Sequence, residues 1–142
     1  MSLEFAGIER RLDRLNECLQ KLEPLRRRPL AEFLTDAYLR DIVERNLEVA
    51  AQCCIDIANR VIALEGAPRP TDYYDSLLRL GEIGVLPIEF AQQIAPLGGF
   101  RNILVHEYLS IEWSVVYDNL QHLEDLARFA DYVRQWMAKR LR

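Results

Sequence analysis

The sequence predicts an all-α fold, an antiparallel helical bundle, and two observations lead to that prediction. Leu, Ala, Glu and Arg, which all favour helices, dominate the composition, and the strict apolar–polar alternation of strands is scarce. Apolar residues instead recur at spacings of three and four, as they do on the buried face of a helix. With 142 residues, 50% of them hydrophobic and 28% charged, the chain is expected to form one globular domain spanning residues 1–142.

Five helical segments are predicted from the apolar spacing and from the Pro, Gly and capping residues between them. They cover residues 3–22, 30–65, 72–80, 88–97 and 111–141. The segments 30–65 and 111–141 each carry an apolar stripe too broad for one neighbouring helix. We expect these two to pair, and their spare apolar surface predicts a homodimer. Gly98 and Gly99 are expected to interrupt the chain before the helical turn at Arg101, and Ser110 is a candidate cap for the last helix.

Charge and cysteine content limit the classes of function. The net charge of −4 means that any contact with nucleic acid must come from a local basic patch. Cys53 and Cys54 are adjacent, and no second Cys or His pair stands at the spacing of a zinc site, so we expect buried thiols, no disulfide and no metal. Charges near the N-terminus interrupt any signal-peptide core, and no apolar run approaches about 18 residues. A cytoplasmic protein without a membrane span is therefore predicted.

One short segment combines side chains that can handle a phosphate, in the pattern Arg101-x4-His106-x-Tyr108 with Asn102 directly after the arginine. An arginine can hold a phosphate with a two-pronged guanidinium and stabilise charge that develops on it. A histidine can transfer protons at neutral pH, and a tyrosine adds a hydroxyl donor. On an ideal helix Arg101 and His106 lie about 140° apart, so either the helix ends near Val105 or both residues flank a cleft.

RNA suits such a site because its own 2′-hydroxyl is a nucleophile, so cleavage needs neither a metal nor another cofactor. The reaction needs one base and one acid, and this segment supplies a single histidine. A two-fold dimer would bring two copies of Arg101 and His106 to one groove. His122, the other histidine of the sequence, is the alternative partner within one chain.

A polar stripe follows the second predicted helix at spacings of three and four, formed by Arg45, Glu48, Gln52, Asp56 and Asn59. For Glu48 and Asn59 we favour the interpretation that they belong to a solvent-exposed helix face, on which side chains one turn apart interact. Gln52 and Asp56 are predicted to line the cleft and to orient Arg101 or His106 through hydrogen bonds.

The run from Gly99 to Tyr108 resembles the R-x4-H-x-Y signature of HepT-like proteins in the HEPN superfamily, and residues 45–58 and 75–87 are similar to the same family. The resemblance, spanning about residues 31–117, implies a HEPN-like bundle of four to five helices that dimerises around a composite cleft. It implies the toxin of a type VII-like toxin–antitoxin pair, a metal-independent endoribonuclease with Arg101 and His106 as catalytic residues and Asn102 beside them.

The resemblance also implies a partner, a minimal nucleotidyltransferase antitoxin that adenylylates Tyr108 to O-AMP-tyrosine. An AMP group there would neutralise the nearby cation and fill the groove. Two other interpretations stay open at this point. The chain could be a non-catalytic nucleotide-binding or adaptor partner of a nucleotidyltransferase, or a helical dimer in which Arg101 and His106 only satisfy hydrogen bonds of the core.

Overall fold

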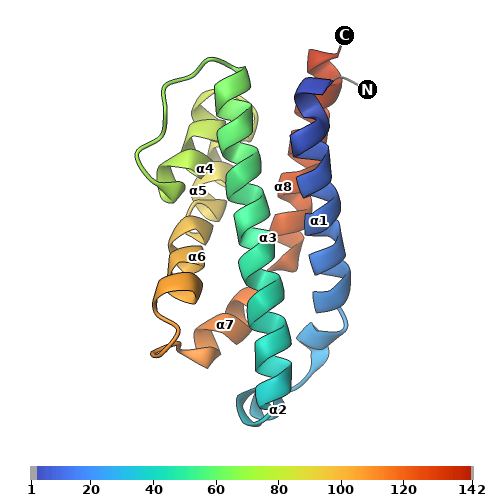
Figure 1. Ribbon diagram of the computed structural model, residues 1–142, viewed down its shortest axis with the longest axis vertical. Helices are drawn as coiled ribbons and strands as arrows, with labels where there is room; N and C mark the ends of the chain where they lie inside the picture. Colours follow the sequence, from blue (N-terminus) through green and yellow to red (C-terminus); the bar gives the residue numbers. More distant parts are fainter. Residues whose placement is uncertain (1–2, 142) are drawn as a thin grey trace.

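The structure, a computed structural model, describes residues 3–141 and contains helices but no strands in that range (Figure 1). The all-α prediction is therefore confirmed. Eight α-helices and two short 3₁₀ helices follow one another in the described part of the chain: η1 Leu3–Phe5, α1 Ala6–Leu22, η2 Leu25–Arg27, α2 Leu30–Thr35, α3 Ala37–Leu64, α4 Tyr73–Glu82, α5 Ile88–Ile94, α6 Leu97–His106, α7 Trp113–Leu120 and α8 Leu123–Arg140. Between residues 3 and 141 no helix is both long and apolar enough to cross a membrane.

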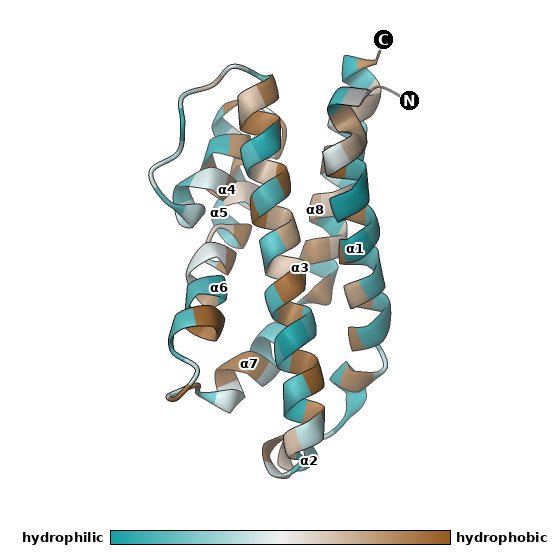
Figure 2. Cartoon of the chain, viewed as in Figure 1, coloured by the Kyte–Doolittle hydropathy of each residue, from teal (hydrophilic) through white to brown (hydrophobic). Residues whose placement is uncertain are grey.

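The longest helix, α3, runs through the middle of the bundle (Figure 1). Helices α1 and α8 lie on one side of it and α4 to α6 on the other, and α1 runs antiparallel to α3. Helix α1 turns Ile8, Leu12 and Leu15 into the core at the spacing expected of one helix face, while Figure 2 shows hydrophilic residues on much of its outer surface. Most of the buried apolar residues of these layers form one core cluster.

The prediction of one continuous helix over residues 30–65 is wrong in one respect. The chain breaks at Asp36 and forms two helices there, α2 and α3. The backbone of Asp36 is extended (φ −100°, ψ 100°), and its carboxylate accepts a hydrogen bond from the backbone N–H of Leu39 at 3.1 Å. Asp36 is thus the N-cap of α3, a position for which aspartate is well suited. The apolar stripe continues across the break, which is why periodicity alone did not reveal it.

The predicted helix over residues 111–141 is also divided, into α7 and α8. The backbone C=O of Gln121 accepts a hydrogen bond from Nη2 of Arg26 at 2.6 Å, and the Gln121 amide donates to the C=O of Arg26 at 3.1 Å. These contacts with η2 stabilise a turn in which the N–H of His122 bonds to Asn119 instead of continuing the helix. Ser110 is not a cap, because Glu112 occupies the residue before α7.

The sequence predicted that Gly98 and Gly99 interrupt the chain, but both residues lie inside α6. The element predicted over residues 88–97 ends at Ile94. A Cβ at Gly98 would lie 2.7 Å from the backbone carbonyl carbon of Tyr73 and 2.8 Å from the backbone nitrogen of Tyr74. Glycine is therefore required where α6 crosses the start of α4. This close approach sets the position of α6, which carries Arg101.

Candidate functional site

Arg101 is half-buried on α6, between α3 and α4. Its Nε donates a hydrogen bond to Oε1 of Gln52 at 2.6 Å, and its Nη1 donates to Oδ1 of Asn102 at 3.1 Å. The guanidinium carbon lies 5.3 Å from the ring centroid of Tyr73, within the range of a cation–π contact. Its Nη2 makes no hydrogen bond within residues 3–141. The guanidinium is thus held in place with donors left for an anionic ligand.

The polar stripe of α3 meets Arg101 through Gln52. The Gln52 amide nitrogen donates to Oδ1 of Asp56 at 2.8 Å, and Oδ2 of Asp56 lies 3.5 Å from Nε of Arg11 on α1. Asp56 therefore fixes the orientation of the Gln52 amide, so that its oxygen faces Arg101. The predicted contact with Arg101 is made by Gln52 directly and by Asp56 only through it.

His106 is the last residue of α6 and is exposed. The helix continues through it, because the N–H of Glu107 still donates to the C=O of Ile103 at 3.0 Å. On this helix His106 lies about 140° around the axis and about 7.5 Å along it from Arg101. Within residues 3–141 no hydrogen bond or ion pair joins His106 to another side chain. A single chain thus does not bring the two side chains together.

Tyr108 lies just beyond α6, in the segment that connects it to α7, and is 67% exposed. The N–H of Ser110 donates to the C=O of Glu107 at 3.0 Å, so the segment folds into a turn around Tyr108. Its phenol makes no hydrogen bond to the rest of the described chain. The hydroxyl is accessible to a second protein and stands two residues from His106.

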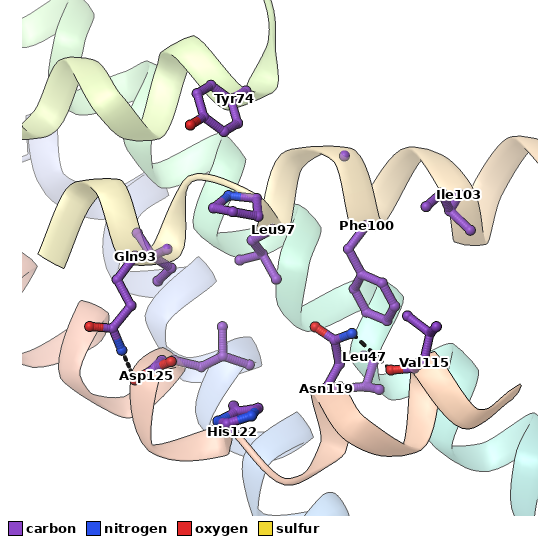
Figure 3. Close-up of a pocket in the computed structure, with 14 residues that line it drawn as sticks. Leu47, Tyr74, Gln93, Leu97, Phe100, Ile103, Val115, Asn119, His122 and Asp125 are labelled. Atoms are coloured by element: carbon purple, nitrogen blue, oxygen red, sulfur yellow. Dashed lines mark hydrogen bonds between the residues drawn. The ribbon is translucent and has the colours of Figure 1, made fainter. Parts of the chain in front are cut away.

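His122 faces a different region, a cavity of about 680 Å³ between α6 and the α7–α8 turn (Figure 3). Phe100 and Ile103 of α6 line its opposite side, and its polar edge includes a hydrogen bond of 3.0 Å from Gln93 to Asp125. Neither Arg101 nor His106 lines this cavity. A site within one chain would need His122 close to Arg101, and the structure does not bring the two residues together.

Residues 3–141 contain no group of three or more His, Cys, Asp and Glu side chains placed to hold a metal ion. Cys18, Cys53 and Cys54 are buried free cysteines. Burial raises the pKa of all three thiols, that of Cys53 to about 11. They are therefore protonated at neutral pH, whereas metal binding and nucleophilic attack need the thiolate.

Sequence reasoning missed Tyr73 as a neighbour of Arg101. Two features of the sequence bear on the contact between Tyr73 and Arg101. Tyr73 directly follows the cap residue Asp72, and residue 98 is a glycine. Neither signal says which helices cross, so the pair is visible only in the fold.

The sequence matches known proteins over most of its length. Residues 15–133 match the family model described as ribonuclease HepT-like. The chain is 31% identical to the tRNA nuclease HepT of Aphanizomenon flos-aquae over 134 residues, which cover 94% of this chain and 90% of that protein. It is 30% identical to the mRNA nuclease HepT of Shewanella oneidensis over 105 residues, or 73% of this chain and 79% of that protein.

The fold is similar to that of the tri-AMPylated HEPN toxin of Shewanella oneidensis, whose structure is known in complex with an MNT antitoxin. The TM-score is 0.82 at 26% identity, and the match covers 95% of this chain and 99% of the toxin. Both α3 and α6, which carry Gln52, Arg101 and His106, lie within the residues that match the family.

Proposed function

We propose, because this chain belongs to the HepT-like ribonuclease family, that it is the toxin of a type VII-like toxin–antitoxin pair and cuts RNA without a metal ion. Ribonuclease activity is what the family is named for, and both curated relatives are RNA nucleases. The observation that carries the proposal is Arg101, held by Gln52 and Tyr73 with guanidinium donors left over, on the helix that ends in an exposed His106.

The chemistry follows from these side chains. The 2′-hydroxyl oxygen attacks the adjacent phosphorus, the bond to the 5′-oxygen of the next nucleotide breaks, and a 2′,3′-cyclic phosphate forms. One imidazole takes the proton of the 2′-hydroxyl, and a protonated imidazole gives a proton to the leaving 5′-oxygen. The guanidinium of Arg101 stabilises the charge on the phosphoryl oxygens in the transition state. Gln52 and Asp56 act as positioning residues for Arg101.

A homodimer supplies the second imidazole and faces Arg101 of one subunit with His106 of the other. Exposed apolar residues support this arrangement. Tyr38 (83% exposed) and Ile42 (49% exposed) precede Gln52 on α3 at helical spacing, so they lie on the same face as the candidate site. Leu109, beside Tyr108, is 89% exposed. Tyr38 and Ile42 lie about four and three turns before Gln52, so the exposed apolar surface extends along α3 from the candidate site, and exposed apolar surface is typical of an interface.

The test is cleavage of RNA by the purified protein in the presence of EDTA. Arg101→Ala and His106→Ala should each lower the rate by about a hundredfold to ten-thousandfold, because each removes a group that acts in the transition state. His122→Ala is the matched control and should keep the wild-type rate. Size-exclusion chromatography should show the same dimer for all three variants.

Cleavage that survives both substitutions would refute the site, and equal loss in His122→Ala would favour a site within one chain. A wild-type protein that cuts no RNA but still binds the nucleotidyltransferase would point to the adaptor interpretation instead.

Regulation by the antitoxin is the second part of the proposal. The exposed hydroxyl of Tyr108 would attack the α-phosphorus of ATP on the nucleotidyltransferase, lose its proton and release pyrophosphate. The attached AMP carries a phosphodiester and a base next to His106, and a negative charge that pairs with Arg101.

Intact-mass measurement after co-expression with the nucleotidyltransferase checks this regulation. AMP additions are expected on the wild type and on the control Tyr38→Phe, whose tyrosine is also exposed, but not on Tyr108→Phe. Additions that persist in Tyr108→Phe would place the modification elsewhere.

A further inference from the structure

Four arginines line a cavity of about 560 Å³ between α1 and α3, outside the site described above. The side chains that form its walls are Arg10, Arg11, Arg14 and Arg60, and Gly7 and Cys53 complete it. We call these residues the arginine cavity. In a chain with a net charge of −4, it is the kind of local basic patch that contact with nucleic acid requires.

Gly7 explains how arginines from two helices meet. A Cβ at this position would lie 2.4 Å from Nη1 of Arg60, so the missing side chain leaves room for the Arg60 guanidinium to cross from α3 onto α1. Nη1 of Arg11 donates to the backbone C=O of Gly7 at 3.0 Å. The guanidinium groups of Arg11 and Arg60 therefore converge on the same residue, although glycine inside a helix costs about 1 kcal/mol relative to alanine.

The positive charge of the arginine cavity is only partly balanced. Asp56 lies 3.5 Å from Nε of Arg11, and Glu17 lies 3.2 Å from Nη1 of Arg14. Arg10 and Arg60 form no ion pair with any residue of the described range 3–141. The thiol of Cys53 contributes no negative charge, since burial raises its pKa to about 11. Four guanidinium groups thus face two carboxylates, which leaves a surplus of positive charge for an anion.

The arginine cavity is connected to Arg101 across α3. Arg101 bonds to Gln52 at 2.6 Å, Gln52 to Asp56 at 2.8 Å, and Asp56 lies 3.5 Å from Arg11. The cavity and the candidate catalytic arginine are therefore separated by the width of one helix, with α1 and α6 flanking α3 (Figure 1). Because an α-helix with its side chains is about 10–12 Å across, a strand with one phosphate at Arg101 reaches the cavity with a phosphate more than one nucleotide away.

We infer that the arginine cavity binds backbone phosphates of the RNA strand beyond the cleavage position, an inference that rests on the proposed ribonuclease function. Guanidinium groups match the geometry of phosphate oxygens and form two-pronged hydrogen bonds with them. Contacts of this kind hold a strand in register without reading its sequence. An acidic protein is the alternative ligand, but the position of the cavity directly across α3 from Arg101 favours the strand that Arg101 itself contacts.

The test is binding of a fluorescent single-stranded RNA of about 20 nucleotides, followed by anisotropy as a function of salt. All proteins carry His106→Ala so that the RNA is not cut. Arg10→Ala/Arg60→Ala should weaken binding by about tenfold at about 100 mM salt and reduce the slope of log K against log salt by about 1.4, because each lost phosphate contact on a single strand is worth about 0.7. Neither arginine has a partner to lose among residues 3–141, so the fold should be retained, which circular dichroism checks.

The matched control is Arg27→Ala/Arg134→Ala, which removes the same charge from exposed positions outside the cavity. It should leave affinity and slope close to the wild-type values. The inference is overturned if the cavity variant binds like the wild type or if the control weakens binding equally. It is also overturned if the cavity variant loses affinity only for the nucleotidyltransferase, since the cavity would then be a protein interface.

Cleavage assays separate this inference from the proposed function. With His106 restored, Arg10→Ala/Arg60→Ala should raise KM for the long RNA without changing kcat, and should cut a dinucleotide, which is too short to reach the cavity, at the wild-type rate. If the wild type cuts RNA and the cavity variant has unchanged affinity and KM, the inference about the cavity is wrong but the proposed function stands. If the wild type binds RNA through the cavity but cuts none, the proposed function is wrong but the binding role of the cavity stands.

Discussion

Replacing Gly98 by alanine should displace α6 from α4 and so disturb Arg101. The new Cβ would meet the backbone of Tyr73 and Tyr74 at 2.7 and 2.8 Å, closer than nonbonded atoms approach. Backbone atoms cannot rotate away as a flexible side chain can, so the helices must move apart. Arg101 is three residues further along the same face of α6, so the movement also separates its guanidinium from the Tyr73 ring.

Gly99 provides the reference that isolates the cost of this clash. A Cβ at Gly99 meets no neighbouring element within 4 Å. Both substitutions gain about 0.5–1 kcal/mol, because alanine favours the helix over glycine. Only Gly98→Ala adds an overpacking cost of about 1–3 kcal/mol. The free energy of unfolding should therefore be lower for Gly98→Ala than for Gly99→Ala by about 1–3 kcal/mol, with Gly99→Ala at or above the wild type.

Urea denaturation at one fixed protein concentration measures the difference, since a dimer's stability depends on concentration. RNA cleavage measures the second effect, and a shift of Arg101 by about 1 Å should lower kcat by roughly tenfold to a hundredfold in Gly98→Ala alone. Equal stability of the two variants, or normal cleavage by Gly98→Ala, would refute the view that this contact positions the catalytic arginine.

Three further predictions follow from single contacts. Asp36→Ala should lower the free energy of unfolding by about 1 kcal/mol, because α3 loses the side-chain cap on the N–H of Leu39; a urea denaturation curve identical to that of the wild type would contradict this. Gln52→Leu should reduce kcat by about tenfold to a hundredfold without loss of the dimer, because it removes the acceptor from Nε of Arg101; wild-type cleavage would show that Arg101 needs no such support. Burial raises the pKa of Cys53 from 9.0 to about 11, so the folded state holds this proton more tightly than the unfolded state, and stability should fall as pH rises from 9 towards 11. Cys53→Ala should flatten that decline in denaturation curves measured across this range, and an unchanged slope would contradict the assignment.

Helical periodicity predicted where the helices lie but not where the two long ones break. The stripe of residues 30–65 passes through Asp36 without a gap, although aspartate is a common cap and could have raised the question. The break before α8 depends on hydrogen bonds between Gln121 and Arg26, which are 95 residues apart in the sequence. A contact between residues so distant leaves no periodic trace.

The candidate site divides in the same way. The motif at Arg101 and His106 and the polar stripe with Gln52 are local patterns that the sequence shows, and in the structure a hydrogen bond joins Gln52 to Arg101. Tyr73 meets Arg101 because Gly98 lets α6 pass close to the backbone of α4, and Gly7 leaves the space on α1 that the Arg60 guanidinium of the arginine cavity occupies. In these two places the missing side chain of a glycine allows two neighbours to come close, and the spacing of residues in the sequence does not predict which neighbours these are.

The composite site is tested most directly by a hybrid dimer in which one subunit is wild type and the other carries His106→Ala. Such hybrids can be isolated with two different affinity tags, and a hybrid with His122→Ala serves as the control. If two histidines face one RNA phosphate, the His106 hybrid should lose about a hundredfold or more in cleavage rate, since one acid–base group is missing. If it instead keeps about half of the wild-type rate, each subunit works alone, and the account of a shared cleft is wrong.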